Sequence, residues 1–298
     1  MTAVPATVRI VEVGARDGLQ NEKTIVPTPA KIELIDRLSD TGLQTIEATS
    51  FVSPKWVPQL ADAAEVYAAI RKKAGVRYPV LVPNLQGYER ARSVGATEIA
   101  VFTAASEAFN RKNINASIDE SIERFLPVME RARADAVAVR GYVSTVLGCP
   151  YQGDVPIADV VRVARHLHDL GCYEISLGDT IGIGTPAKAR SMLSAVAGEV
   201  PMTALAVHFH DTRGQALANI LACLELGVAV VDASVSGTGG CPYAPGASGN
   251  VATEDVVYML HGMGVATGVD LDRLIDTGRW LSAQLGRDNG SKVGKAAA

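Results

Sequence analysis

The sequence predicts an α/β fold, and within that class a (β/α)8 TIM barrel with additional C-terminal helices. Short apolar segments alternate with amphipathic stretches along nearly the whole chain, which is typical of a parallel sheet with helical crossovers. About eight strand–helix units can be counted, which suits a closed barrel. The alternative is an open doubly wound sheet. The barrel is favoured because the chemically reactive side chains fall just after predicted strands, where barrels carry their active sites.

The predicted strands are short, apolar and rich in β-branched residues. They span residues 8–13, 45–48, 78–82, 98–102, 138–146, 173–177, 203–208 and 229–235. Helices follow most of them; the first lies between Pro29, which suits a first helical turn, and Gly42, which suits a helix end. These helices span residues 28–41, 60–74, 84–95, 118–134, 154–170, 186–198 and 214–226. The segment after the fourth strand, with Arg111 and Lys112, is interpreted as a loop.

Two further helices, near residues 253–262 and 271–285, follow the eighth strand. No low-complexity linker divides the chain, and single barrels often reach this length. We therefore expect one catalytic domain. It comprises residues 1–298, with the barrel over about 8–236, a glycine-rich loop over 237–250 and C-terminal helices within about 253–286.

Composition excludes several classes of protein. The 298 residues are 48% hydrophobic and 20% charged, with a net charge of −4, so neither a nucleic-acid nor a membrane partner is expected. No apolar run approaches the roughly 18 residues of a membrane span. The four cysteines form no C-x-x-C pair, which indicates reduced thiols. A strand is predicted almost at the first residue, with no room for a signal peptide, so a cytoplasmic location is expected.

Two histidines mark the end of the seventh predicted strand. His208 and His210 are one residue apart, and the strand period of two places both imidazoles on one face. The H-x-H pattern alone is a weak metal signal. A second pair, His166 and His168, lies in a predicted helix, where residues two apart do not face each other. Only the first pair is therefore a candidate for one site.

Asp17 and Asn250 could complete a site with these histidines. Two imidazoles, a carboxylate and an amide oxygen suit a hard or borderline divalent cation. Each also has a structural interpretation: Asp17 can cap a loop, and Asn250 precedes the helix that begins near Thr253. Further polar residues converge on the same predicted mouth from other strands. These are Glu12, Arg16, Glu47 and Asp179.

The segment 237–249 is dense in glycine, which allows close backbone approach to a ligand. It lacks the G-K-[ST] of a phosphate loop. Cys241 lies in it, within a G-C-P-Y sequence that also occurs around Cys149. The sequence does not rank the two thiols decisively, although the glycine-rich setting favours Cys241. Cys172 and Cys223 are expected to be buried and inert.

Around these residues the chain resembles the 3-hydroxy-3-methylglutaryl-CoA lyase family. The matching blocks are E-V-G-A-R-D-G-L-Q-N-E (12–22), I-E-A-T-S-F-V-S-P-K-W-V-P-Q (46–59), G-Y-V-S-T-V-L-G-C-P-Y (141–151), Y-E-I-S-L-G-D-T-I-G-I-G-T-P (173–186), F-H-D-T-R-G-Q-A-L-A-N (209–219) and G-G-C-P-Y-A-P-G-A-S-G-N-V-A-T-E-D (239–255). A wider group of acyl-CoA-using TIM barrels shares the R-D and H-x-H motifs. The block around Cys241 resembles the lyases rather than the condensing synthases.

The resemblance implies a set of roles for the site. Mg²⁺ or Mn²⁺ would be bound by Asp17, His208, His210 and Asn250, and no nucleotide cofactor is implied beyond the CoA of the substrate. Arg16 would contact the thioester carbonyl, Cys241 would be the catalytic thiol, and Glu47 would lie near the metal. Substrate contacts are further expected from Asp179, Ser50 and Tyr142. A homodimer or higher homo-oligomer is implied as well.

The implied reaction is the retro-Claisen cleavage of 3-hydroxy-3-methylglutaryl-CoA into acetyl-CoA and acetoacetate. The group that first removes the hydroxyl proton stays open among Asp17, His208 and a water at the metal. The chain departs from the family pattern at Ala15, Arg213 and Thr238. Arg213 and Thr238 adjoin the site and put the preferred acyl group in question. The alternatives are a lyase for a longer branched 3-hydroxyglutaryl-CoA, an acetyl-CoA/2-keto acid synthase, and a catalytically inactive barrel.

Overall fold

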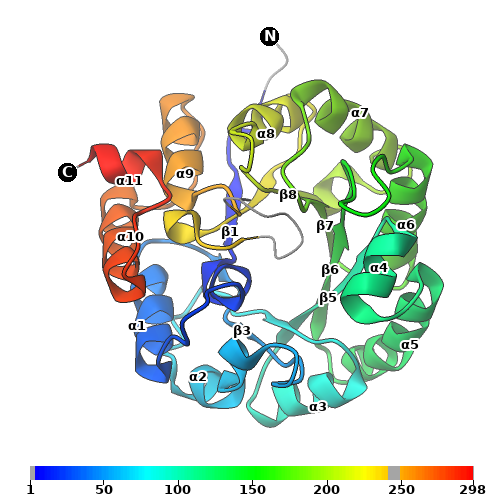
Figure 1. The fold of residues 1–298 in the computed structure, drawn as a ribbon, viewed down its shortest axis with the longest axis horizontal. Helices are drawn as coiled ribbons and strands as arrows, with labels where there is room; N and C mark the ends of the chain where they lie inside the picture. Colours follow the sequence, from blue (N-terminus) through cyan, green and yellow to red (C-terminus); the bar gives the residue numbers. More distant parts are fainter. Residues whose placement is uncertain (1–3, 241–248, 298) are drawn as a thin grey trace.

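Strand pairing closes the sheet into a barrel. In this computed structural model, which describes residues 4–240 and 249–297, nine strands pair in parallel in the order β2-β1-β9-β8-β7-β6-β5-β4-β3. They are β1 (Arg9–Glu12), β2 (Thr45–Ile46), β3 (Thr49–Ser50), β4 (Val80–Leu81), β5 (Glu98–Ala104), β6 (Ala138–Ser144), β7 (Glu174–Asp179), β8 (Leu205–Phe209) and β9 (Val230–Ala233). β2 and β3 are pieces of one short segment, so the two ends of the order meet. Figure 1 shows the resulting ring, surrounded by helices. The predicted (β/α)8 barrel is confirmed.

The helices form the outer layer. They are α1 (Thr28–Ser39), α2 (Ala63–Ala69), α3 (Leu85–Ser93), α4 (Glu107–Ile114), α5 (Ile118–Ala134), α6 (Ile157–Asp169), α7 (Pro186–Val196), α8 (Ala216–Leu224), α9 (Thr253–Gly262), α10 (Leu271–Leu285) and α11 (Lys292–Ala296). Their apolar faces form one large buried cluster with the outward-facing strand residues. None of the helices in the described ranges is both long and apolar enough to cross a membrane.

Three features differ from the sequence prediction. The second strand is interrupted because its first residues pair with β1 and its last with β4. The segment interpreted as a loop with Arg111 and Lys112 contains α4, since the Ser106 side chain accepts the Phe109 N–H and caps a helix. The short α11 was not predicted. Ser291 caps it, and its first turn is held by the Asp255 carboxylate, a contact that the local sequence does not display.

The barrel interior carries charge. In a strand, alternate side chains face the same side, so β6 directs Arg140 and Tyr142 inward while Val139 and Val143 pack outward in the main cluster. The same alternation directs Glu174 of β7 and Asp232 of β9 inward, where both pair with the fully buried Arg140. A layer of ion pairs therefore lies within the ring, in strands whose other residues are mostly apolar.

The C-terminal helices support the start of the glycine-rich segment. A short 3₁₀ turn, η4 (Val235–Gly237), follows β9. Glu12 accepts the Val235 N–H at 2.9 Å, and Glu254 of α9 accepts the Ser236 N–H with both oxygens, at 2.9 and 3.0 Å. Gly278 of α10 leaves room for this contact, because a Cβ there would lie 2.1 Å from Glu254 Oε1. Two buried glutamate side chains from opposite ends of the chain thus fasten one turn.

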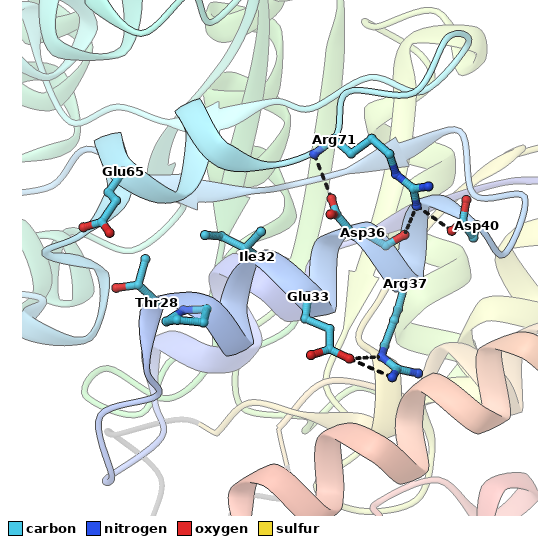
Figure 2. A pocket seen from close by; sticks show the side chains of 9 residues that line it. Thr28, Ile32, Glu33, Asp36, Arg37, Asp40, Glu65 and Arg71 are labelled. Atoms are coloured by element: carbon cyan, nitrogen blue, oxygen red, sulfur yellow. Dashed lines mark hydrogen bonds and ion pairs between the residues drawn. The ribbon is translucent and has the colours of Figure 1, made fainter.

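A surface groove lies on the outside of the ring, along α1 and the residues around α2 (Figure 2). Its two arginines are paired with acidic side chains of the same groove: Arg37 with Glu33 on α1, and Arg71 with Asp40. The Arg71 backbone N–H also donates to Asp36. Because both arginines of the groove are paired with carboxylates of the same groove, we interpret it as a structural feature of the helical layer.

We predict that the buried acids make stability depend on pH. Burial raises the pKa of Glu254 from 4.5 to about 8 and that of Glu12 to about 7. In the folded chain these two side chains keep their protons at pH values above 4.5, where the same side chains of the unfolded chain have released them. Stability should therefore fall as the pH rises from about 4.5 to 8, by about 1.4 kcal/mol per pH unit for each proton, and level off above this window.

Urea unfolding of wild type and Glu254→Gln across this range tests the prediction. The neutral variant lacks one of the two titrations, so the stability advantage of wild type over the variant should shrink as pH rises. Taking this difference cancels the contributions of other groups. A difference that stays constant from pH 5 to 8 would contradict the prediction.

Candidate active site

A tight turn after β1 presents the first two site residues. The turn η1 (Gly14–Gly18) is of the π type, with the N–H groups of Asp17 and Gly18 both directed at the Val13 carbonyl. Such turns are often found at functional sites. Gly18 is required here because a Cβ would lie 2.4 Å from Thr238 Oγ1. The turn places Arg16 and Asp17 side by side at the carboxyl end of the barrel.

Arg16 is clamped between two carboxylates. Its Nε donates to Glu47 Oε2 at 2.6 Å and its Nη1 to Asp17 Oδ1 at 2.7 Å. Glu47 is fully buried, and burial raises its pKa despite the neighbouring guanidinium. Burial also tends to raise the pKa of Asp17, but Arg16 and the two histidines outweigh it and lower that pKa to about 2. Asp17 is therefore a carboxylate at any physiological pH.

The histidine pair lies beside Asp17. The Nε2 atoms of His208 and His210 are 3.4 Å apart, and His208 Nε2 is 3.9 Å from Asp17 Oδ2. One ligand atom from each of the three residues lies within 4.8 Å of the others, a spacing that a metal ion could bridge. Burial, with His208 close by, lowers the pKa of His210 to about 4, so its ring is neutral near pH 7. The predicted shared face of the H-x-H pair is thus found in the structure.

The donor set fits a divalent cation. His210 Nδ1 is buried and has no hydrogen-bond partner within residues 4–240 and 249–297. The Nε2 atoms of the two rings face each other across 3.4 Å, so a cation placed near both could replace that contact. Neutral imidazoles and a carboxylate are suitable ligands for several divalent ions. The chain therefore contains a possible metal site of three residues, one from the turn after β1 and two from the carboxyl end of β8.

Asn250 joins this cluster from the far end of the glycine-rich segment. It forms an antiparallel bridge with His210, and its Nδ2 donates to Asp17 Oδ2 at 2.8 Å and to the Thr238 carbonyl at 3.2 Å. A cation ligand would need the amide oxygen instead. In the described arrangement Asn250 serves as a hydrogen-bond donor that ties the loop to Asp17.

Tyr142 lies among the charged groups of the site. Its ring centroid is 5.4 Å from the Arg16 guanidinium carbon, and its ring meets His208 edge-on at 6.2 Å. Burial raises the pKa of its hydroxyl far above the usual value, so the hydroxyl stays protonated. The structure therefore brings Tyr142 to Arg16, as a substrate-binding role would require.

Asp179 and Ser50 are held by local backbone. Asp179 is fully buried at the end of β7, and its oxygens accept the N–H groups of Ile183 at 3.1 Å and Gly184 at 2.8 Å. The buried Ser50 hydroxyl accepts the Val52 N–H at 3.2 Å. In the described residues neither side chain hydrogen-bonds to Arg16 or Asp17. Both shape loops at the mouth, and their contact with substrate stays a prediction.

The described cysteines differ in the surroundings of their sulfur atoms. Cys241 lies outside the described residues. Cys149 is buried, and its sulfur accepts the Ser106 hydroxyl at 3.0 Å and the N–H groups of Tyr151 and Gln152 at 3.3 and 3.5 Å. Cys149 therefore stabilises a turn. Cys172 and Cys223 are buried as expected, and burial raises the pKa of each to about 12.

The sequence interpretation missed two residues that contact the site from below. Asp232 of β9 lies 3.3 Å from His208 Nδ1, and Arg140 of β6 pairs with Asp232. In the sequence each of these residues is visible only as a single charge within an apolar strand. Such a charge does not predict a site by itself, because its partner lies many residues away along the chain.

Comparisons with known proteins agree with this geometry. The HMGL-like family model matches residues 7–281. The mitochondrial hydroxymethylglutaryl-CoA lyase of Gallus gallus is 63% identical over 295 residues, which cover 99% of both chains. The crystal structure of hydroxymethylglutaryl-CoA lyase from Pseudomonas aeruginosa has a TM-score of 0.97 and 59% identity, covering 99% of this chain and 98% of that one.

A third relative has a ligand in its structure. An HMG-CoA lyase from Acinetobacter baumannii, solved in complex with coenzyme A and 3-methylmalate, has a TM-score of 0.94 and 41% identity, covering 99% of this chain and 97% of the other. Similarity of this extent covers the barrel and the described site residues alike. The chain therefore belongs to the HMGL-like family and, within it, to the hydroxymethylglutaryl-CoA lyases.

Proposed function

We propose that the chain cleaves 3-hydroxy-3-methylglutaryl-CoA into acetyl-CoA and acetoacetate with the help of Mg²⁺ or Mn²⁺. The observation that carries this proposal is the buried Arg16 guanidinium beside the Asp17, His208 and His210 cluster, at the carboxyl end of the barrel. A fixed cation next to a possible metal site suits a reaction that develops negative charge on oxygen. The A. baumannii relative, solved with coenzyme A, supports an acyl-CoA as the partner molecule.

The proposed metal ligands are Asp17, His208, His210 and Asn250. A divalent cation bound there would act as a Lewis acid toward oxygen atoms of the substrate. The buried and unpartnered Nδ1 of His210 and the facing Nε2 atoms support this set. Asn250 would enter through its amide oxygen, whereas its nitrogen faces Asp17 in the described arrangement. A Cβ at Gly239 would lie 2.7 Å from Asn250 Nδ2, so glycine leaves the amide its space.

The reaction breaks one carbon–carbon bond. The tertiary hydroxyl of the substrate loses its proton, the bond to the carbon beside the thioester breaks, and the electron pair enters the thioester as an enolate. A proton delivered to that carbon completes acetyl-CoA, and the other fragment is acetoacetate. Asp17 and His208 are the described side chains able to accept the hydroxyl proton, and Glu47 acts through Arg16.

Arg16 would stabilise the enolate oxygen. Nε and Nη1 are bound by Glu47 and Asp17, whereas Nη2 has no protein partner in the described part of the chain. The clamp therefore fixes the plane of the guanidinium and leaves one edge for a ligand. A donor fixed before the reaction stabilises developing charge without having to reorganise.

Cys241 would deliver the proton to the enolate carbon. It directly follows Gly240, and the described ends of its loop lie at the cluster: Asn250 bridges to His210, and its amide donates to the Thr238 carbonyl. A Cβ at Gly249 would lie 2.5 Å from the Gly239 carbonyl carbon, so the two ends meet. This closure beside His210 supports Cys241 over Cys149.

The departures at Arg213 and Thr238 have structural explanations. Arg213 donates to the carbonyls of Ile181 and Gly182 at 3.1 and 3.0 Å and so holds the loop after β7. Thr238 is fully buried, with its hydroxyl 2.5 Å from Ser234 Oγ. Neither contact favours a longer acyl chain, so the 3-hydroxy-3-methylglutaryl substrate is retained in the proposal.

The remaining expectations also stay proposals. A single catalytic domain is supported by the family model, which spans residues 7–281 without a break. Cytoplasmic location and a homodimeric or higher assembly rest on the sequence and on the family resemblance.

The central prediction concerns the metal. The chain should cleave 3-hydroxy-3-methylglutaryl-CoA when Mg²⁺ or Mn²⁺ is present, lose this activity with excess EDTA, and regain it when the cation is restored. Acetoacetate formation measures the turnover. Full activity after complete chelation would contradict the metal proposal. Release of free CoA from acetyl-CoA and a 2-oxo acid, without lyase activity, would favour a condensing synthase.

A second prediction concerns Arg16. Arg16→Gln should lower kcat by about 10²–10³, the usual cost of losing one donor to a developing oxyanion. Arg16→Lys should restore little of the lost kcat, because a lysine ammonium cannot bind Glu47 and Asp17 together in the fixed plane that the guanidinium provides. A parallel Mn²⁺ titration should show that both variants still bind the metal. Near-normal kcat in Arg16→Gln would remove Arg16 from the mechanism.

A third prediction separates the two G-C-P-Y thiols. Cys241→Ala should reduce turnover by orders of magnitude with little change in Tm, because only the proton donor is lost. The matched variant Cys149→Ala should keep most of the turnover but lower Tm, because three hydrogen bonds to that sulfur disappear. The reverse pattern would assign the catalytic role to Cys149.

A further inference from the structure

Asp232 lies inside the barrel directly beneath the histidine pair. It is 1% exposed and stands on β9 at the register position opposite His208 of β8. Because alternate strand residues face the same side, both side chains point into the ring. None of the proposed chemical steps uses Asp232.

The position of Asp232 is determined by several contacts. Arg140 donates to Oδ1 at 2.7 Å and to Oδ2 at 2.9 Å, and the Ser176 hydroxyl donates to Oδ2 at 2.7 Å. Arg140 is in turn fixed by Glu174, which accepts its Nε at 2.7 Å. A two-pronged arginine–carboxylate pair restricts orientation as well as distance. Asp232 is therefore a rigid acceptor.

This acceptor determines which nitrogen of His208 carries the proton. Both oxygens of Asp232 already accept hydrogen bonds from the Arg140 guanidinium, and Oδ2 also accepts one from Ser176, which is the arrangement of an ionised carboxylate. An ionised carboxylate can only accept, so His208 Nδ1, at 3.3 Å, must donate. In the neutral form of an imidazole that donates through Nδ1, the lone pair is on Nε2, which here faces Asp17 and His210.

His210 provides an internal contrast. Its Nδ1 is buried without a partner within the described ranges, so no carboxylate orients its ring from behind. The two histidine rings therefore lie on the same face of the chain, but only the His208 ring has a carboxylate behind it within the described ranges. If the site binds a cation, His208 is the ligand whose orientation the barrel interior fixes in advance.

We propose that Asp232 is a positioning residue of the metal centre, holding His208 in the Nδ1–H tautomer with Nε2 directed at the cation, while Arg140 and Ser176 hold Asp232. The proposal rests on the proposed function, because His208 is one of its assigned ligands. Carboxylates behind metal-binding histidines typically change metal affinity or activity by 10- to 100-fold when they are removed.

A purely structural role is the alternative, and Glu174 is the matched control for it. Glu174 and Asp232 are both buried carboxylates that pair with Arg140 at 2.7 Å, but only Asp232 contacts His208. Asp232→Asn and Glu174→Gln each remove one negative charge from the same network without changing side-chain size. A loss of stability should be common to both variants, and a loss of metal affinity should not.

The experiment is a Mn²⁺ titration of the full chain, followed by the EPR signal of free Mn²⁺, with Tm measured in parallel. Asp232→Asn should raise the Kd about 10- to 100-fold. Glu174→Gln should leave the Kd near the wild-type value although its Tm falls. Equal Kd values for Asp232→Asn and wild type would overturn the positioning role, as would equal weakening in both variants. A wild-type chain without Mn²⁺ binding would overturn the proposed function as well.

A second measurement needs no substitution at Asp232. In metal-free wild type with ¹⁵N-labelled histidine, long-range ¹H–¹⁵N spectra report which ring nitrogen is protonated. The chain has only 5 histidines, and His208→Gln identifies the signal of interest. A proton on Nδ1 of His208 is the expected result. A neutral ring protonated on Nε2 would overturn the proposal even if Asp232→Asn does not fold.

Discussion

The structure depends on the neutralisation of one buried cation. Arg140 is fully buried inside a ring of strands, where an unpaired charge would be prohibitively costly. Glu174 of the adjacent strand β7 and Asp232 of β9 compensate it, and this places Asp232 under His208. The orientation of a proposed metal ligand is thus a consequence of how the barrel accommodates charge in its core. The packing requirement and the chemical requirement are met by the same carboxylate.

The same arrangement recurs at the mouth. Arg16 is neutralised by Glu47 and Asp17, and Asp17 also faces the histidines. Tyr142 joins the two levels, because both guanidinium carbons lie near its ring, at 5.4 Å for Arg16 and 4.9 Å for Arg140. Each arginine shares a carboxylate with a histidine. Electrostatic pairing therefore extends from the middle of the barrel to the site where substrate charge would develop.

Local signals in the sequence were enough for the barrel, the shared face of the H-x-H pair and the convergence of Asp17 with it, because strand period and the position of strand ends determine them. Long-range pairing was not accessible. Arg140 and Asp232 are 92 residues apart, and each appears in isolation as one charge in an apolar strand. The helix α4 was missed because Ser106 begins only a short helix. The split second strand was missed because its pairing changes partner within a few residues.

Both described ends of the glycine-rich loop are tied to the site. At its start, Glu12 and Glu254 bind the backbone of Val235 and Ser236, so the end of β1 and the start of α9 hold one turn. At its end, Asn250 binds His210 through backbone and Asp17 through its amide. The loop therefore leaves and rejoins the barrel between the two strands that supply the cluster. The strands that fix Asp17 and the histidines also fix both described ends of this loop.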